Sequence, residues 1–141
     1  MRSVLLFFLL ISIQPVLASE KITLIAHLSA TLIPHTLAPK KIKNIYLLKQ
    51  RNWPDETPII VVTRRATDPL RQKFEQALGL NRKKYALYLR KMHYKGVRLP
   101  LIQNSRQAVL DFVENVPGTI SYIEGFVPNT YQHINNIGEL Q

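Results

Sequence analysis

One short segment, from Pro58 to Thr63, constrains the fold of this chain more than any other. After Pro58 the sequence reads Ile-Ile-Val-Val-Thr, which is almost continuously apolar and β-branched. A strand with water on one face alternates apolar and polar residues, whereas a strand covered on both faces is apolar throughout. The segment 59–63 is therefore predicted to be a strand with other elements packed on both of its faces.

Helical segments alternate with further strand candidates along the chain. Four helices are expected, each beginning at a residue typical of helix N-termini, namely Pro39, Asp68 followed by Pro69, Asn81, and either Asn104 or Ser105. Other apolar runs are strand candidates, at residues 22–28, 99–103 and 119–123. Helical connections between apolar strands favour a partly parallel sheet. We therefore predict an α/β fold, with a small mixed sheet of about four strands and helices packed on it.

The first 18 residues are predicted to be a signal peptide. Arg2 provides the positive charge, residues 4–13 are almost purely apolar, and small or modest side chains precede an expected cleavage after Ala18. The alternative is an uncleaved membrane anchor, but the apolar run is shorter than the ~20 residues that span a bilayer. Cleavage leaves a domain at 19–128 and a polar, loosely held C-terminal tail at 129–141. We expect a periplasmic or secreted protein with no transmembrane segment after signal cleavage.

The absence of cysteine and the net positive charge limit which chemistry and which partners are expected. The chain has no cysteine, which excludes disulfides and thiol chemistry, so the domain must be held together by its apolar core. Its formal net charge of +10 at pH 7 indicates anionic partners such as phosphate, anionic lipid or an acidic protein. The alternative is a solvated basic surface with no specific partner. Because export is expected, nucleic acid is not expected as a partner.

Four stretches carry a resemblance to a known family: 42–53 (IKNIYLLKQRNW), 53–62 (WPDETPIIVV), 68–80 (DPLRQKFEQALGL) and 115–123 (NVPGTISYI). In their order and spacing they resemble the short, single-domain relatives of the periplasmic phosphate-binding proteins of ABC transporters. The resemblance implies one lobe of a type II periplasmic binding protein and a link to phosphate-type anions. It also implies a link to export, and an ABC transporter or an envelope protein is the expected protein partner. Complete proteins of this kind close two lobes around the ligand, and this chain can supply one.

The turn before the helix at Pro69 is the candidate anion site. A helix N-terminus presents unpaired N–H groups and the positive end of the helix dipole. Arg64, Thr67 and Arg71 lie around it, and guanidinium groups match phosphate geometry. Asp68 opposes this interpretation, because as N-cap it occupies an N–H group and places negative charge beside the anion. Two interpretations therefore stay open: a weak site for a phosphate-like anion, or a capped helix with solvated arginines.

A second basic cluster occupies residues 82–98, interleaved with Tyr85, Tyr88 and Tyr94. Interleaved basic and aromatic residues occur in nucleic-acid binding proteins. Here the tyrosines fall at helical spacing with Leu89, which favours packing against the core. The basic side of this helix is a candidate contact for anionic lipid or an acidic partner.

Catalytic, metal and cofactor sites are not expected. The four histidines His27, His35, His93 and His133 have no metal-ligand spacing, and no nucleophile turn is present. We therefore expect an exported, non-enzymatic ligand-binding protein resembling the phosphate-binding proteins of ABC transporters. The alternative is a periplasmic interaction module that has lost small-ligand binding and uses its basic face for an acidic protein or envelope partner.

Overall fold

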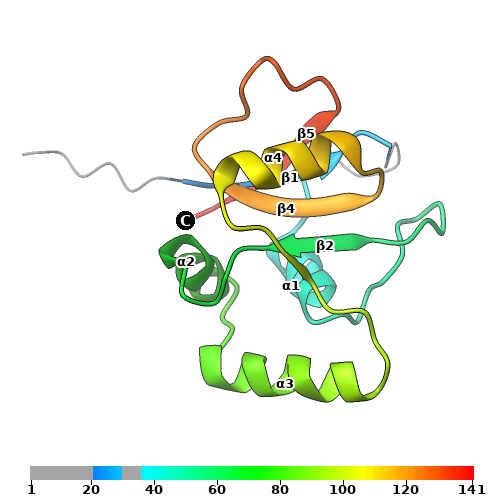
Figure 1. Cartoon of the computed structure of the whole chain (residues 1–141), viewed down its shortest axis with the longest axis vertical. Helices are drawn as coiled ribbons and strands as arrows, with labels where there is room; N and C mark the ends of the chain where they lie inside the picture. The colour runs from blue at the N-terminus through cyan, green and yellow to red at the C-terminus, as the bar shows by residue number, and fades with distance from the viewer. Residues whose placement is uncertain (1–20, 30–35) are drawn as a thin grey trace, which may run out of the picture.

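The computed structural model describes residues 21–29 and 36–141, and shows strands and helices alternating along the chain (Figure 1). Their order is β1 (Ile22–His27), α1 (Pro39–Tyr46), β2 (Ile60–Thr63), α2 (Pro69–Ala77), α3 (Arg82–Tyr94), β3 (Leu101–Ile102), α4 (Arg106–Asn115), β4 (Thr119–Glu124) and β5 (Ile134–Leu140). The predicted signal peptide and its cleavage after Ala18 lie outside the described residues.

The five strands form one mixed sheet in the order β3-β2-β4-β1-β5. Strand β2 lies parallel to both of its neighbours, β3 and β4, whereas β1 is antiparallel to β4 and β5. The predicted α/β class and mixed sheet are confirmed, and β5 is one strand more than the expected four. Strand β2 is interior in this sheet, as its apolar sequence indicates.

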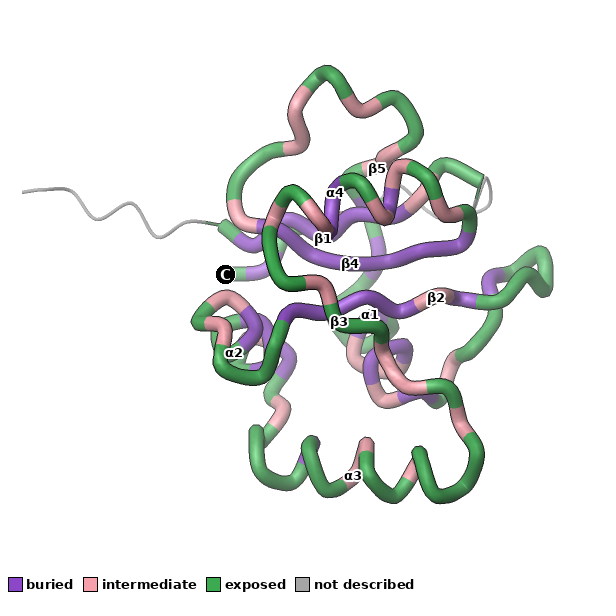
Figure 2. Tube along the Cα trace, viewed as in Figure 1, coloured by how far each residue is buried: buried purple, intermediate pink, exposed green. Residues whose placement is uncertain are grey.

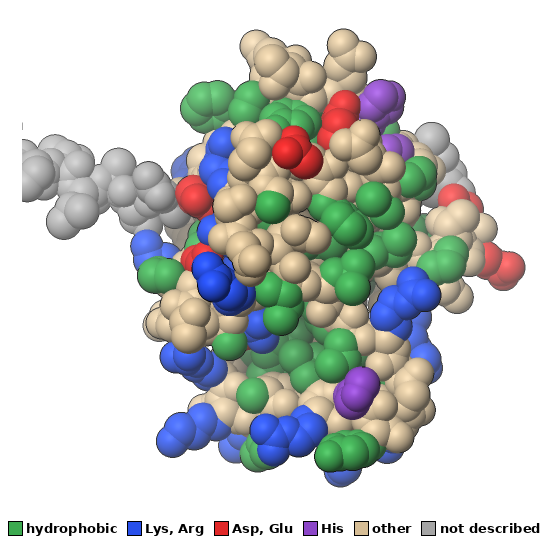
Figure 3. Space-filling view, in the orientation of Figure 1, with side chains coloured by type: hydrophobic (Ala, Val, Ile, Leu, Met, Phe, Trp, Pro, Cys, Tyr) green, Lys and Arg blue, Asp and Glu red, His purple; other side chains and the backbone are tan. Residues whose placement is uncertain are grey.

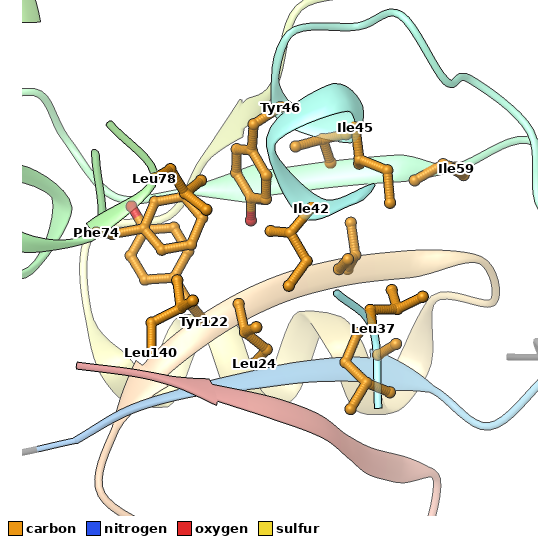
Figure 4. Packing of buried hydrophobic residues seen from close by; sticks show 14 of the residues in the cluster. Leu24, Leu37, Ile42, Ile45, Tyr46, Ile59, Phe74, Leu78, Tyr122 and Leu140 are labelled. Carbon is orange, nitrogen blue, oxygen red and sulfur yellow. The ribbon is translucent and has the colours of Figure 1, made fainter. Parts of the chain in front are cut away.

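Helices cover both faces of the sheet. On one face, Ile42 of α1 and Phe74 of α2 pack with Leu24 of β1 (Figure 4). On the other face, Val109 of α4 packs with Ile25 of the same strand. Because successive side chains of a strand point to opposite faces, β1 contributes to both core layers. Figure 2 shows the buried positions running along β1, β4 and β2 between these helices.

The helices begin at the predicted capping residues. Asp68, Asn81 and Ser105 each accept a hydrogen bond from a backbone N–H in the first turn of α2, α3 and α4. Ser105, rather than Asn104, is therefore the cap of α4. Pro39 begins α1, where the missing proline N–H leaves no helical hydrogen bond unmade. No helix within the described part of the chain is both long and apolar enough to cross a membrane.

Trp53, in the loop between α1 and β2, closes one end of the core. It is 4% exposed, and its Nε1 donates a hydrogen bond to the carbonyl of Gly118 at 2.9 Å. Gly118 has φ +82°, and a Cβ there would lie 2.6 Å from the carbonyl oxygen of Pro58. The turn between α4 and β4 therefore requires glycine for both its conformation and its packing.

The C-terminal segment forms a strand that was not predicted from the sequence. Residues 129–141 were expected to be a loosely held tail, but β5 pairs with β1 along the sheet edge. A β-bulge interrupts this pairing, so Ile137 and Leu140 point into the same core although they are three residues apart. The bulge removes the period of two that identifies a strand in sequence. The sheet and its core therefore extend past the predicted boundary at residue 128.

Candidate functional site

The candidate anion site lies where β2 ends and the chain turns into α2. Since β2 and β4 are parallel, their carboxyl ends meet at one edge of the sheet, which is where open α/β sheets bind ligands. The hydroxyl of Tyr122 lies 2.8 Å from Oγ1 of Thr63 and accepts from the N–H of Arg64 at 3.3 Å. The Tyr122 ring stacks on Phe74 with ring centroids 3.8 Å apart. Burial raises the pKa of Tyr122, so this hydroxyl stays protonated and holds the start of the turn.

Arg64 is the central cation of the turn. It is only 8% exposed, and its Nη2 lies 2.8 Å from Oδ2 of Asp68. Its Nε and Nη1 atoms are buried and have no hydrogen-bond partner among the described residues. Buried donors without partners are unfavourable by about 1–3 kcal/mol, so these two atoms are the strongest indication of ligand chemistry in the turn.

Arg71 connects the turn to helix α2. Its Nε donates to Oε1 of Glu75 at 2.8 Å, and its Nη1 donates to the carbonyl of Arg64 at 2.9 Å. Both Arg71 and Glu75 are buried. Most of the Arg71 guanidinium is therefore engaged within the protein, and its contacts are those of a residue that shapes the turn.

The three predicted site residues are not equivalent in the structure. Arg71 contacts the backbone of Arg64, whereas Thr67 is exposed and its hydroxyl bonds to no described residue. The charges of Arg64 and Arg71 are each balanced by a carboxylate of the chain itself. Anion binding by this set of three stays a prediction.

A cavity of about 220 Å³ lies beside the turn, lined by Asp68, Pro69, Leu70, Lys73 and Glu124. Glu124 is the last residue of β4, and its Oε2 is buried without a partner among the described residues. Lys73 adds an exposed cation. The sequence analysis missed Lys73 and Glu124, because Glu124 reaches this edge only through the pairing of β4 with β2.

A second polar cluster lies at the opposite end of the strands, between the end of β1 and the segment before β5. The rings of His27 and His133 stack with centroids 5.8 Å apart. Glu114 accepts from the N–H groups of Gln132 and His133 and lies 2.9 Å from Nδ1 of His133. Burial, and then the charge of His133, lower the pKa of His27. The contacts of Glu114 with Gln132 and His133 join the last loop to α4. Among the described residues no group of three metal-ligating side chains is assembled.

Comparison with solved structures shows that the fold of this chain matches about half of each of three solved proteins, two of which are described as phosphate ABC transport proteins. A protein assigned as a phosphate ABC transporter substrate-binding protein from Clostridium perfringens, with bound phosphate, matches 84% of this chain and 44% of its own, with TM-score 0.63 and 21% identity. An ABC-type phosphate transport receptor from Vibrio cholerae matches 84% of this chain and 46% of its own, with TM-score 0.62 and 19% identity.

PstS from Borrelia burgdorferi matches 86% of this chain and 56% of its own, with TM-score 0.56 and 13% identity. The chain thus spans about half the length of these proteins. Neither a protein-family model nor a curated protein matches the sequence. The resemblance predicted from the four sequence stretches is confirmed at the level of the fold.

Proposed function

We propose that this chain is an exported, non-enzymatic binding protein that takes a phosphate-type anion weakly where β2 turns into α2. The observation that carries this proposal is the buried guanidinium of Arg64, two of whose nitrogens lack partners among the described residues. The turn also lies at the carboxyl edge of parallel strands, next to a helix N-terminus and a cavity of about 220 Å³.

The side chains around the cavity favour an oxyanion that carries a proton. Lys73 on the cavity and Arg64, which is paired with the cavity residue Asp68, supply donors, whereas Asp68 and Glu124 line the cavity and supply acceptors. Phosphate near neutral pH has both oxygens that accept and a hydroxyl that donates. Sulfate has no proton to donate to a carboxylate, so the same set of residues disfavours it.

Binding at this site is expected to be weak. The two cations and two carboxylates cancel in formal charge, and the partnerless nitrogens of Arg64 are sealed from solvent. An anion reaches them only if the Arg64 side chain turns away from Asp68, which breaks their 2.8 Å ion pair. A single lobe also leaves one side of a ligand in water. We expect a dissociation constant on the order of 1 mM, which corresponds to about 4 kcal/mol.

The solved structures support this proposal through their own properties. Two are phosphate transport proteins by description, and one of these contains bound phosphate. Their roles in transport also support export, together with the predicted signal peptide at residues 1–18. An ABC transporter or another envelope protein is the partner class that these roles favour.

The second candidate function is an interaction module that has lost small-ligand binding. The observation in its favour is that Arg64 and Arg71 are each paired with a carboxylate of the chain, Asp68 and Glu75 respectively, at 2.8 Å. A site with internal counter-charges needs no external anion. This function predicts no measurable phosphate binding and an intact fold.

Calorimetric titration of the purified protein with phosphate and with sulfate distinguishes the two functions. We expect weak heat with phosphate, less with sulfate, and none with phosphate for Arg64→Gln. Arg65→Gln removes the same charge from the exposed neighbouring position and serves as control. Absence of heat with the unmodified protein at millimolar phosphate, or equal heat with Arg64→Gln, contradicts phosphate binding at this turn.

A further inference from the structure

Helix α3 contacts the rest of the molecule through one face only. The Tyr85 hydroxyl donates to the carbonyl of Tyr46 at 2.7 Å, and the Tyr88 hydroxyl donates to the carbonyl of Leu47. These carbonyls lie at the C-terminal end of α1, where helical carbonyls lack partners within the helix. The two tyrosines therefore determine which side of α3 faces inward, and Figure 1 shows the helix at one end of the molecule.

The opposite side of α3 presents two apolar side chains between rows of cations. Leu87 is 62% exposed and Tyr94 is 83% exposed, and they lie two helical turns apart along one line. Tyr94 therefore does not pack against the core, contrary to the prediction from the spacing of the tyrosines. Cations flank this line on both sides, again in pairs two turns apart, Lys83 with Arg90 and Lys84 with Lys91. We name these six residues the α3 outer face.

No carboxylate of the surrounding sequence balances this charge. The chain contains no Asp or Glu between Glu75 and Asp111. None of the ion pairs formed among the described residues involves a cation of the α3 outer face. Figure 3 shows Lys and Arg side chains gathered along the edge of the molecule over α3.

We propose that the α3 outer face is a docking surface for an anionic lipid bilayer. In this arrangement Leu87 and Tyr94 enter the headgroup region, and the flanking Lys and Arg side chains contact lipid phosphates. Helices that lie in a membrane interface combine an apolar line with cations in this way. Tyrosine is suited to such a depth because its ring is apolar and its hydroxyl stays hydrated.

The shape and charge of the face favour a bilayer over other occupants. The hollow between Lys84, Leu87 and Tyr94 is shallow and open, and the helix lies along an outer edge of the molecule. A planar surface can contact such an edge over the whole helix, about 20 Å. A second copy of the chain would bring like charges together at this face. The surface shares no residue with the turn at Arg64, so it is independent of phosphate binding.

Sedimentation of the protein with lipid vesicles tests the proposal. We expect binding to vesicles of phosphatidylglycerol and phosphatidylcholine at least about tenfold tighter than to phosphatidylcholine alone. Lys84→Glu with Lys91→Glu is expected to weaken this binding by at least about tenfold, because each cation near an anionic surface contributes about fivefold. Leu87→Ser with Tyr94→Ser is expected to weaken it at unchanged charge.

The matched control is Lys40→Glu with Lys41→Glu, which changes the net charge equally at exposed positions of α1. All variants are prepared with the same N-terminus, so that any contribution of the first residues is common to them. The proposal is overturned if the control loses as much binding as the α3 variant, or if the unmodified protein does not prefer anionic vesicles. Binding to polyglutamate that requires α3, without vesicle binding, overturns it in favour of an acidic protein. A failed phosphate titration leaves these outcomes unchanged.

Discussion

The carboxylate of Asp68 contacts both the guanidinium of Arg64 and the first turn of α2. Its Oδ2 lies 2.8 Å from Nη2 of Arg64, and its Oδ1 accepts from the N–H of Leu70 at 2.9 Å. One side chain therefore caps the helix and balances the charge of the candidate anion site. An anion that enters this turn must compete with Asp68 for Arg64.

Replacement of Asp68 by Asn separates its two roles. Asn caps helices about as well as Asp, so the free energy of unfolding is expected to change little. The Arg64 guanidinium loses its counter-charge, and phosphate affinity is expected to rise about tenfold, or ~1.4 kcal/mol. Calorimetric titration measures this change. Glu56→Gln removes one negative charge from an exposed loop position and should leave the affinity unchanged, so equal gains in both variants would exclude a local effect of Asp68.

The buried pair of Arg71 and Glu75 is expected to contribute to stability. Glu75→Gln leaves the Arg71 charge buried with no counter-charge and is expected to lower the free energy of unfolding by about 3 kcal/mol. Urea unfolding followed by circular dichroism measures this loss. The exposed pair of Lys21 and Glu139 is the comparison, because Lys21→Gln is expected to cost less than about 1 kcal/mol. Similar losses for the two variants would show that burial does not increase the contribution of the Arg71 pair to the free energy of unfolding.

Gly118 and Gly96 have similar backbone conformations but different packing, so alanine substitutions at the two positions separate the effect of packing from that of conformation. Both have positive φ, +82° and +76°, but a Cβ at Gly118 meets the Pro58 carbonyl oxygen at 2.6 Å and one at Gly96 meets nothing within 4 Å. Gly96→Ala is expected to cost about 1 kcal/mol, from backbone conformation alone. Gly118→Ala is expected to cost about 3 kcal/mol, since overpacking adds to it. Equal midpoints of urea unfolding for the two variants would show that the turn at Gly118 adjusts without strain.

The stability of the protein is expected to depend on pH through His27. Burial, followed by the charge of His133, lowers the pKa of His27 below its usual 6.5 in the folded state. A lowered pKa stabilises the folded state above pH 6.5, and this contribution is lost as the pH falls through the folded-state pKa. Glu114 also faces His27 and opposes the shift.

Between pH 7 and pH 5, the free energy of unfolding of His27→Gln is therefore expected to decrease less than that of the unmodified protein. Urea unfolding at both pH values measures this difference. His93→Gln removes an exposed imidazole on α3 and is the control. An unchanged pH dependence in His27→Gln would show that the histidine stack does not contribute.

Part of the candidate site was accessible to sequence reasoning. Asp68 before Pro69 predicted both the cap and the start of α2, and the position of Arg64 in the turn followed from it. The spacing of four residues from Arg64 to Asp68 and from Arg71 to Glu75 also suits ion pairs, and this signal was overlooked. The burial of these pairs cannot be predicted from the local sequence, because it depends on which other elements pack over α2.

The sequence by itself determined the local elements of this protein. Caps at Asp68, Asn81 and Ser105 and the apolar run of β2 act within a few residues, so their effects are readable from the chain. Only the tertiary structure decided the pairing of β5 with β1, across a bulge that hides its period. It also decided the place of Glu124 beside α2, because strand pairing joins residues far apart in sequence. Such contacts depend on the whole core, which no single segment encodes.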